Sequence, residues 1–428
     1  MFVLFFCTSG GAFTTETLVA QVGPGLALLT LVAVPLLWSL PEVLIIGELA
    51  SMLPEEGGYY RWVRRAFGPF WGFQNAWLTW MYSIVDMALY PVLFNQYLAY
   101  FLPGLGWVRQ WVISLAVIWS GAALNLRGAR PVGRAAVVTG SFILLGFLAL
   151  ALAALPYAAH VPWRPFAKGG EGALGALGVG LSLALWNYTG WDNASTVQGE
   201  VRDPSRSYPR ALAFTLPLVT LGYLLPLGAT LAASDWTTWR EGGWPDIARA
   251  SAGALGPALA AWIAFAGLLS ALSLFNSLLL AYSRIPLAMA DDGLLPRLLA
   301  RVDRRGTPVA AVLASAICYS VFALMQLQWL VVADVFLYAL ALFLEFGALI
   351  ALRRNEPELK GTFRIPLGTL GVTVLAAFPV AILMVVLWLE TKDPEFGLPA
   401  VIGALAAIGL GPVAYVLARR FVRAPGAA

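Results

Sequence analysis

The chain has 428 residues, of which 60% are hydrophobic and 12% are charged, and its formal net charge is +4 at pH 7. Soluble globular domains carry about 25% charged residues, so the composition excludes that class. With two cysteines and one histidine, His160 in a predicted loop, the sequence indicates neither a disulfide framework nor a metal site.

Hydrophobic segments of about 20 residues recur along the whole chain, each long enough to cross a bilayer core of roughly 30 Å. The intervals between them leave no room for a separate soluble domain, so residues 1–428 are predicted to form a single all-α membrane domain. We predict twelve transmembrane helices, near residues 2–21, 25–51, 69–99, 107–125, 133–156, 174–199, 211–233, 255–288, 308–326, 330–352, 369–389 and 398–418.

The first and sixth spans are interrupted at matching places, five spans apart. Ser9-Gly10-Gly11 breaks the first span, and residues 187–190 (Asn-Tyr-Thr-Gly) break the sixth. Broken helices in corresponding positions of two halves are typical of secondary transporters built on an inverted repeat. We therefore predict repeats over about 1–156 and 174–352, followed by two further helices within 369–420.

Each break exposes backbone groups that lipid cannot satisfy, so we expect both to line a cavity. A half-helix beginning near Gly11 would direct N–H groups at a carboxylate, and one ending near Trp186 would offer carbonyl oxygens to an ammonium. Trp186 would cover the substrate as a lid. The alternative for any single glycine or tryptophan is helix packing, but packing explains the paired breaks poorly.

Acidic residues lie within the predicted spans, whereas no Lys or Arg is assigned to one. Buried carboxylates are costly unless they are protonated, hydrated or paired, so each is a functional candidate. Asp86, at the centre of the third span, is predicted to contact substrate or a proton. The other acidic residues are Glu16, Glu42, Asp192 and Glu345 within spans, and Glu48 and Glu200 at inner ends.

These other acids have structural alternatives. Glu42 and Glu48 would then cap backbone or face loop arginines, and Glu345 would extend toward Arg353. Glu16 and Asp192 follow the two breaks and are equally compatible with simple helix N-terminal charges.

The basic residues are distributed unevenly between alternate loops. With the N-terminus inside, 21 fall in inner loops and 6 in outer loops, which accounts for all 27. The positive-inside rule then places both termini in the cytoplasm, and the basic balance reflects loop orientation rather than nucleic-acid binding. No cleavable signal peptide is evident, and because few residues precede the first break, we expect the first helix to begin upstream of Met1.

Several motifs resemble the amino acid–polyamine–organocation superfamily of transporters. They are residues 9–13 (SGGAF), 54–59 (PEEGGY) with 65–69 (RAFGP), 186–200 with 203–204 (DP) and 209–211 (PRA), and 290–296 (ADDGLLP) with 307–308 (TP). Within that superfamily, residues 83–94 and 185–200 are most similar to the polyamine-uptake and L-type amino acid branch.

The resemblance implies the leucine-transporter type of five-plus-five inverted repeat, with helices 1 and 6 broken. It also implies substrate contacts from spans one, three, six and eight, which fall here on Ser9, Gly10, Gly11, Asp86, Trp186, Asn187, Tyr188, Thr189, Gly190 and the stretch around Asn276. The chain departs from the pattern in reading Ser-Gly-Gly where Gly-Ser-Gly is usual. It also lacks the lysine that some proton-coupled relatives carry in span five.

These observations predict a secondary transporter of the cytoplasmic membrane, without cofactors, that moves amino acids or polyamines by alternating access and favours cationic substrates. Protons are the predicted coupling ion, carried by Glu16, Asp192 or Glu345. The alternatives are a neutral amino acid transporter or exchanger and, less favoured, a non-transporting sensor. A primary pump lacks its nucleotide motif here, and an enzyme lacks a nucleophile–base pair.

Overall fold

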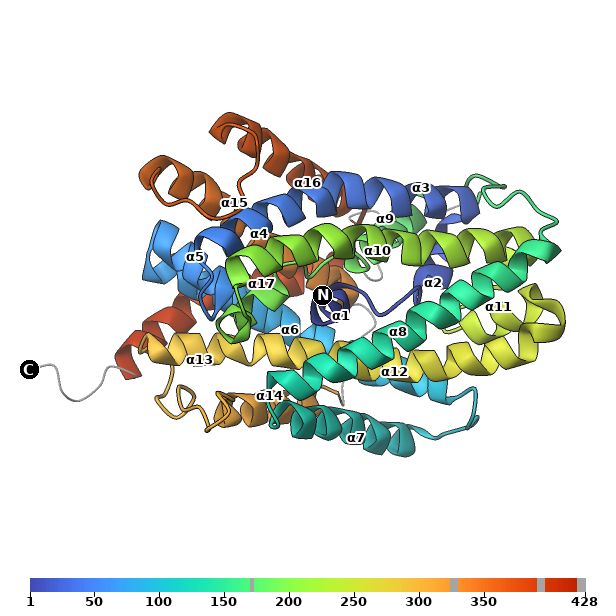
Figure 1. Cartoon of the computed structure of the whole chain (residues 1–428), viewed down its shortest axis with the longest axis horizontal. Coiled ribbons are helices and arrows are strands. Elements are labelled where there is room, and N and C mark those ends of the chain that lie inside the picture. Colours follow the sequence, from blue (N-terminus) through green and yellow to red (C-terminus); the bar gives the residue numbers. More distant parts are fainter. Residues whose placement is uncertain (170–172, 324–329, 391–396, 422–428) are drawn as a thin grey trace, which may run out of the picture.

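The computed structural model describes residues 1–169, 173–323, 330–390 and 397–421. Within those residues the chain is helical and no strand is found. The long helices run side by side along the length of the molecule (Figure 1).

The helices that build the first predicted repeat are short around the first break and long elsewhere. Their bounds are α1 Phe2–Thr8, α2 Thr15–Val22, α3 Pro24–Val34, the π-helix η1 Pro35–Ser39, α4 Leu40–Met52, α5 Gly58–Phe67, α6 Pro69–Leu98, α7 Trp107–Asn125, α8 Ala129–Ala154 and the 3₁₀ helix η2 Leu155–Tyr157.

The remainder follows the same pattern, with short helices at the second break and at the membrane edges. Their bounds are α9 Ala173–Trp186, η3 Asn193–Glu200, α10 Pro204–Ala233, η4 Trp236–Thr238, α11 Trp244–Ser251, η5 Gly253–Leu255, α12 Gly256–Tyr282, α13 Arg284–Asp291, α14 Val309–Phe322, α15 Leu330–Asn355, α16 Thr369–Glu390 and α17 Gly397–Phe421.

Among the described residues, 9 helical stretches are long and apolar enough to cross a membrane. The other three predicted spans consist of shorter pieces, namely α1 with α2, α9 with η3, and α14. Residues 324–326 of the predicted ninth span, and Lys392 and Arg423 of the charge count, lie outside the described residues. The twelve-span total and the inverted repeat therefore stay predictions.

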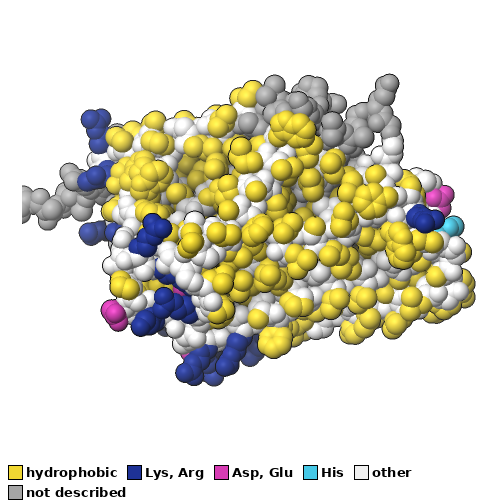
Figure 2. Space-filling view, turned by 90° about the horizontal axis from the view of Figure 1, so that it is seen from above, with side chains coloured by type: hydrophobic (Ala, Val, Ile, Leu, Met, Phe, Trp, Pro, Cys, Tyr) yellow, Lys and Arg dark blue, Asp and Glu magenta, His cyan; other side chains and the backbone are white. Residues whose placement is uncertain are grey.

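The surface is divided as a membrane protein requires. On the face seen in Figure 2 the middle of the molecule is largely apolar, and lysine and arginine side chains gather at the end that carries α5, α13 and the end of α17 (Figures 1 and 2). Val138 and Phe214, on α8 and α10, are 70% and 69% exposed, as expected for side chains that contact lipid tails.

Two arginines correct the expectation that no basic residue lies within a span. Arg353 of α15 is buried and forms a two-pronged ion pair with Glu48 of α4, at 2.7 and 2.5 Å. Arg284, at the junction of α12 and α13, is also buried and pairs with Glu200 at 2.7 Å. Both pairs lie at the arginine-rich end, so Glu48 faces an arginine, as its structural alternative predicts.

Candidate functional site

The first break is longer than its glycines predict. α1 ends at Thr8 and α2 begins at Thr15, so the half-helix starts at Thr15 rather than near Gly11. Gly11 has a φ of 104°, a conformation that glycine adopts without strain. Its N–H, which we expected to be free, donates to Ser9 Oγ at 3.2 Å.

The second break begins where the sequence predicts. α9 ends at Trp186, but the chain beyond Asp192 continues as an eight-residue 3₁₀ helix, η3, instead of the expected α-helical half. Gly190 has a φ of 93°, and a Cβ atom there would lie 2.2 Å from the carbonyl oxygen of Cys7. Only glycine therefore allows the second break to lie this close to the last turn of α1.

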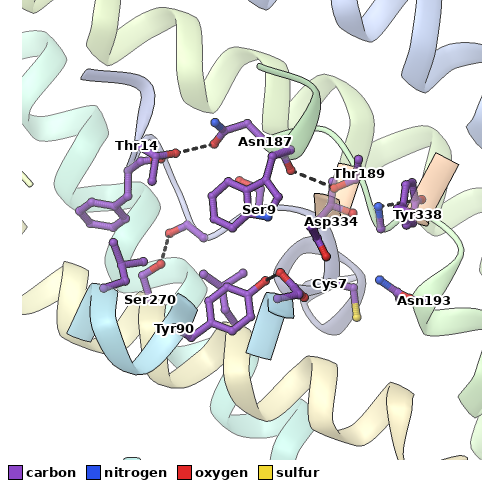
Figure 3. Close-up of a pocket in the computed structure, with 18 of the residues that line it drawn as sticks. Cys7, Ser9, Thr14, Tyr90, Asn187, Thr189, Asn193, Ser270, Asp334 and Tyr338 are labelled. Atoms are coloured by element: carbon purple, nitrogen blue, oxygen red, sulfur yellow. Dashed lines mark hydrogen bonds between the residues drawn. The ribbon is translucent and has the colours of Figure 1, made fainter. Parts of the chain in front are cut away.

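The two breaks also meet through side chains. Thr14 Oγ1 donates to Asn187 Oδ1 at 2.9 Å, and Ser270 Oγ of α12 donates to the Gly10 carbonyl at 2.7 Å (Figure 3). These contacts satisfy backbone and amide groups that unwinding leaves free. They also fix the walls of a pocket.

The pocket lies between both breaks and helices α6, α10, α12 and α15. It has about 530 Å³ of space, including its opening to solvent, which lies in the range of small-molecule sites. Eight predicted substrate residues line it: Ser9, Gly10, Gly11, Asp86, Trp186, Asn187, Thr189 and Gly190.

Two predicted substrate residues are not among those that line the pocket. Tyr188 is buried, and its hydroxyl donates to the Leu31 carbonyl of α3 at 2.9 Å. Asn276 faces α7, where its carbonyl accepts from Asn125 Nδ2 at 3.1 Å. On α12 the pocket is lined instead by Ser270, Leu274 and Tyr282.

Asp86 occupies the pocket wall formed by α6 and is 5% exposed. It accepts hydrogen bonds from the hydroxyls of Tyr90 at 2.5 Å and Tyr282 at 3.1 Å. The Tyr90 ring stacks on Trp186, with centroids 6.5 Å apart and planes 24° apart. The carboxylate is thus held by hydroxyls beside an aromatic surface, an arrangement that suits a cation.

Sequence reasoning missed a second acidic residue in this pocket, Asp334 of α15. It is 4% exposed, lines the pocket, and its Oδ1 has no hydrogen-bond partner among the described residues. Figure 3 shows its side chain among those that surround the cavity. Asp334 lies within the predicted span 330–352, so the rule that singled out Asp86 applies equally to it.

None of the residues that line the pocket is a lysine or an arginine. A cavity with two buried carboxylates, one of them unpartnered, therefore has no cation from these residues to balance it. Buried charges of this kind require a proton or a bound cation.

The three predicted coupling residues lie outside the pocket lining. Glu16, the second residue of α2, accepts the Gly242 N–H at 3.0 Å. Glu345 accepts from Asn75 Nδ2 at 3.3 Å, and its other oxygen has no partner among the described residues. Asp192 precedes η3, and its Oδ1 is 2.8 Å from the Tyr338 hydroxyl.

Comparison with known proteins accords with the helices and the paired breaks. A sequence model of the amino acid permease family matches residues 1–410. The chain belongs to the amino acid permease family, within the amino acid–polyamine–organocation superfamily.

The permease is 37% identical to the polyamine transporter PUT1 of Oryza sativa subsp. japonica over 418 residues, which cover 96% of this chain and 76% of the relative. It is 36% identical to the polyamine transporter RMV1 of Arabidopsis thaliana, over 96% of this chain and 83% of the relative. It is 26% identical to an uncharacterised transporter of Legionella pneumophila, over 79% of this chain and 77% of the relative. The family and these relatives are transporters, which supports a transport function for the permease.

Proposed function

We propose that this permease is a secondary transporter that carries polyamines across the cytoplasmic membrane. The observation that carries the proposal is the pair Asp86 and Asp334 in a pocket whose lining residues include no basic side chain. A polyamine brings at least two ammonium groups, so it can neutralise both carboxylates at once. Relatives that are themselves named polyamine transporters support this reading.

A neutral amino acid fits this pocket less well. It would bring its own carboxylate to a cavity that already contains two, and it needs backbone N–H groups to bind that carboxylate. The Gly11 N–H, expected to serve this purpose, is already bonded to Ser9. A cationic amino acid would likewise bring its own carboxylate into the pocket.

Transport in this proposal proceeds by alternating access around the two breaks, with helices rocking about the pocket. The chain carries twelve spans in a five-plus-five inverted repeat, with both termini in the cytoplasm. Protons are the coupling ion, and a buried carboxylate outside the pocket lining carries them, Glu16, Asp192 or Glu345. Substrate remains in the pocket, so binding and coupling use different carboxylates.

Uptake into liposomes containing the purified permease tests this function. Radiolabelled putrescine and spermidine are compared with arginine, leucine and alanine, under an inward proton gradient and an inside-negative potential. We expect uptake of polyamines, and ligand at about 100 times Kd should stabilise the protein by roughly 2.7 kcal/mol. Asp86→Asn should remove both effects, whereas Asp246→Asn, which changes an exposed carboxylate paired with Arg240, should remove neither. If neither polyamines nor amino acids move under any gradient, the proposal is wrong.

A further inference from the structure

Beside the pocket, two buried carboxyl groups meet at a single tyrosine hydroxyl. The Tyr338 hydroxyl oxygen of α15 lies 2.5 Å from Glu42 Oε1 of α4 and 2.8 Å from Asp192 Oδ1. The same oxygen accepts the N–H of Gly190, in the second break, at 2.8 Å. Glu42 and Asp192 are 0% and 1% exposed.

Counting hydrogens at this hydroxyl shows that a proton is missing if both acids are ionised. A tyrosine hydroxyl has one proton to donate and accepts up to two hydrogen bonds. The Gly190 N–H uses one acceptor position, and the hydroxyl proton serves one carboxylate. The remaining contact between oxygens is a hydrogen bond only if the other carboxyl group is itself protonated and donates to Tyr338.

No basic side chain among the described residues is available to balance a second negative charge. Glu42 Oε2 is buried and has no hydrogen-bond partner among the described residues. Five further titratable side chains face the two acids from the neighbouring helices, and none of them is a cation: Cys7 of α1, Tyr59 of α5, Tyr82 of α6, Tyr208 of α10 and Glu345 of α15. Arg353, the buried arginine of α15, is already committed to Glu48.

We propose that the coupling proton of this permease is shared between Glu42 and Asp192 across the Tyr338 hydroxyl. The inference rests on the proposed transport function and narrows its coupling site. It assigns Glu42 a functional role in place of the structural one that the sequence left open, and it selects Asp192 from the three candidates.

The arrangement links protonation to the pocket and to the helix break. Tyr338 lines the pocket together with Asp334, and its hydroxyl holds the Gly190 N–H of the break. With the proton present, α4, α15 and residues 190–192 are joined through one oxygen. When the proton leaves toward the cytoplasm, one carboxylate loses its hydrogen bond and faces another negative charge. The hydrogen bonding at the Tyr338 hydroxyl then weakens, which allows the second break to move relative to α15.

The variant Glu42→Gln tests the proposal without removing the contact. A glutamine amide donates an N–H to Tyr338 in place of the acid O–H, so the hydrogen bonds remain, but no proton can leave. Glu345→Gln tests a rival coupling candidate, because it removes another fully buried carboxyl group that does not touch Tyr338. Asp246→Asn, which changes an exposed carboxylate, is the control and should keep the gain from a pH gradient described below.

Liposomes containing the full-length permease separate two readouts. In the wild type, an inward gradient of about one pH unit should raise spermidine accumulation about tenfold for each coupled proton, since a factor of ten corresponds to about 1.4 kcal/mol. Glu42→Gln and Asp192→Asn should lose this gain but retain spermidine counterflow, which needs no net proton movement. Glu345→Gln should keep the gain.

The outcomes separate this inference from the proposed function. If Glu42→Gln accumulates spermidine under the pH gradient as the wild type does, the proposal that Glu42 and Asp192 share the proton is wrong. It is also wrong if Glu345→Gln is the variant that loses the gain while Glu42→Gln and Asp192→Asn keep it. If the wild type exchanges spermidine without any gain from the gradient, the inference fails and polyamine transport stands. If the wild type neither binds nor exchanges polyamines or amino acids, the proposed function itself fails.

A second measurement covers the case in which Glu42→Gln does not fold. A pH dye trapped inside wild-type liposomes reports protons that enter with spermidine. Acidification that requires spermidine supports a coupled proton, and its absence overturns the inference whatever the variants do.

Discussion

The acidic residues at the arginine-rich end of the bundle differ sharply from those at its centre. At that end, Glu48 pairs with Arg353, Glu200 with Arg284, and Asp292 with both Arg61 and Arg64. At the centre, Asp86 accepts hydrogen bonds from two tyrosine hydroxyls and is not in any ion pair found among the described residues, where Asp334 Oδ1 has no partner either.

This difference separates structural acids from functional ones. A carboxylate balanced by an arginine of the same chain is already neutralised and serves packing or the inner loops. A carboxylate without such a partner must receive its positive charge from substrate or from a proton, and only that kind can change during transport. The following variants would break or sharpen this distinction, in order of expected effect.

Arg353→Met should have the largest effect on stability. It leaves Glu48 buried without its partner, and removing one member of a buried ion pair costs about 3–5 kcal/mol. Thermal unfolding in detergent should show a large drop in Tm. The exposed neighbour Arg354 supplies the control, since Arg354→Met should change little.

The double variant Glu48→Gln/Arg353→Met sharpens this test, because it removes both charges and should regain part of the loss. An Arg353→Met protein as stable as the wild type would contradict a structural role for this pair.

Asp334→Asn should act on binding rather than on stability. It removes one of two like charges in the pocket, so the Tm should not fall. A charge-assisted hydrogen bond contributes about 1.5–3 kcal/mol, which corresponds to roughly 10- to 100-fold weaker spermidine binding. Binding of a monoamine, which needs only one carboxylate, should change far less.

Comparison of spermidine with butylamine by isothermal titration measures this selectivity. Equal losses for both amines would show that Asp334 does not hold a second ammonium group.

Arg61→Ala should have a small effect, because Asp292 has several partners. It also pairs with Arg64 and accepts from the Tyr60 hydroxyl at 2.6 Å. Arg61 is partly exposed, and ion pairs at the surface contribute about 0–1 kcal/mol. Chemical unfolding should therefore place Arg61→Ala close to the wild type, with Asp292→Asn clearly less stable because it leaves two arginines unpaired.

The smallest effect is expected at Glu56, in the turn between α4 and α5. Burial raises the pKa of its carboxyl group, and the nearby Glu200 adds to the shift. A carboxyl group whose pKa is raised in the folded state binds more protons folded than unfolded. Its contribution therefore favours folding at low pH and is lost as pH rises above the usual value of about 4.3.

At pH 8, Glu56→Gln should accordingly have a Tm at least as high as that of the wild type. On acidification, the Tm of Glu56→Gln should rise less than the Tm of the wild type. Tm measured from pH 5 to pH 8 tests this expectation, with Glu55→Gln, the neighbour in the same turn, as the control. A Glu56→Gln protein less stable than the wild type at pH 8 would reverse the sign of the effect.

The sequence alone determined the features that depend on neighbouring residues. Apolar length predicts where helices lie, Gly10, Gly11 and Gly190 mark the breaks, and the family follows from motifs spread along the chain. Asp86 and most residues of the breaks were predicted and do line the pocket. The extent of the first break was underestimated, because Thr14 adopts a positive φ that its residue type does not signal.

Only the tertiary structure decided which acids have partners. Glu48 and Arg353 are 305 positions apart, and Glu42 and Tyr338 are 296 apart. Helical periodicity shows which residues share a face, but not which face of another helix it meets. For the same reason the sequence did not show that Asp334 lies in one pocket with Asp86. It also did not show that Asn276 faces α7 instead of the pocket. The sequence thus shows which side chains carry a charge, while helix packing decides which of those charges are neutralised.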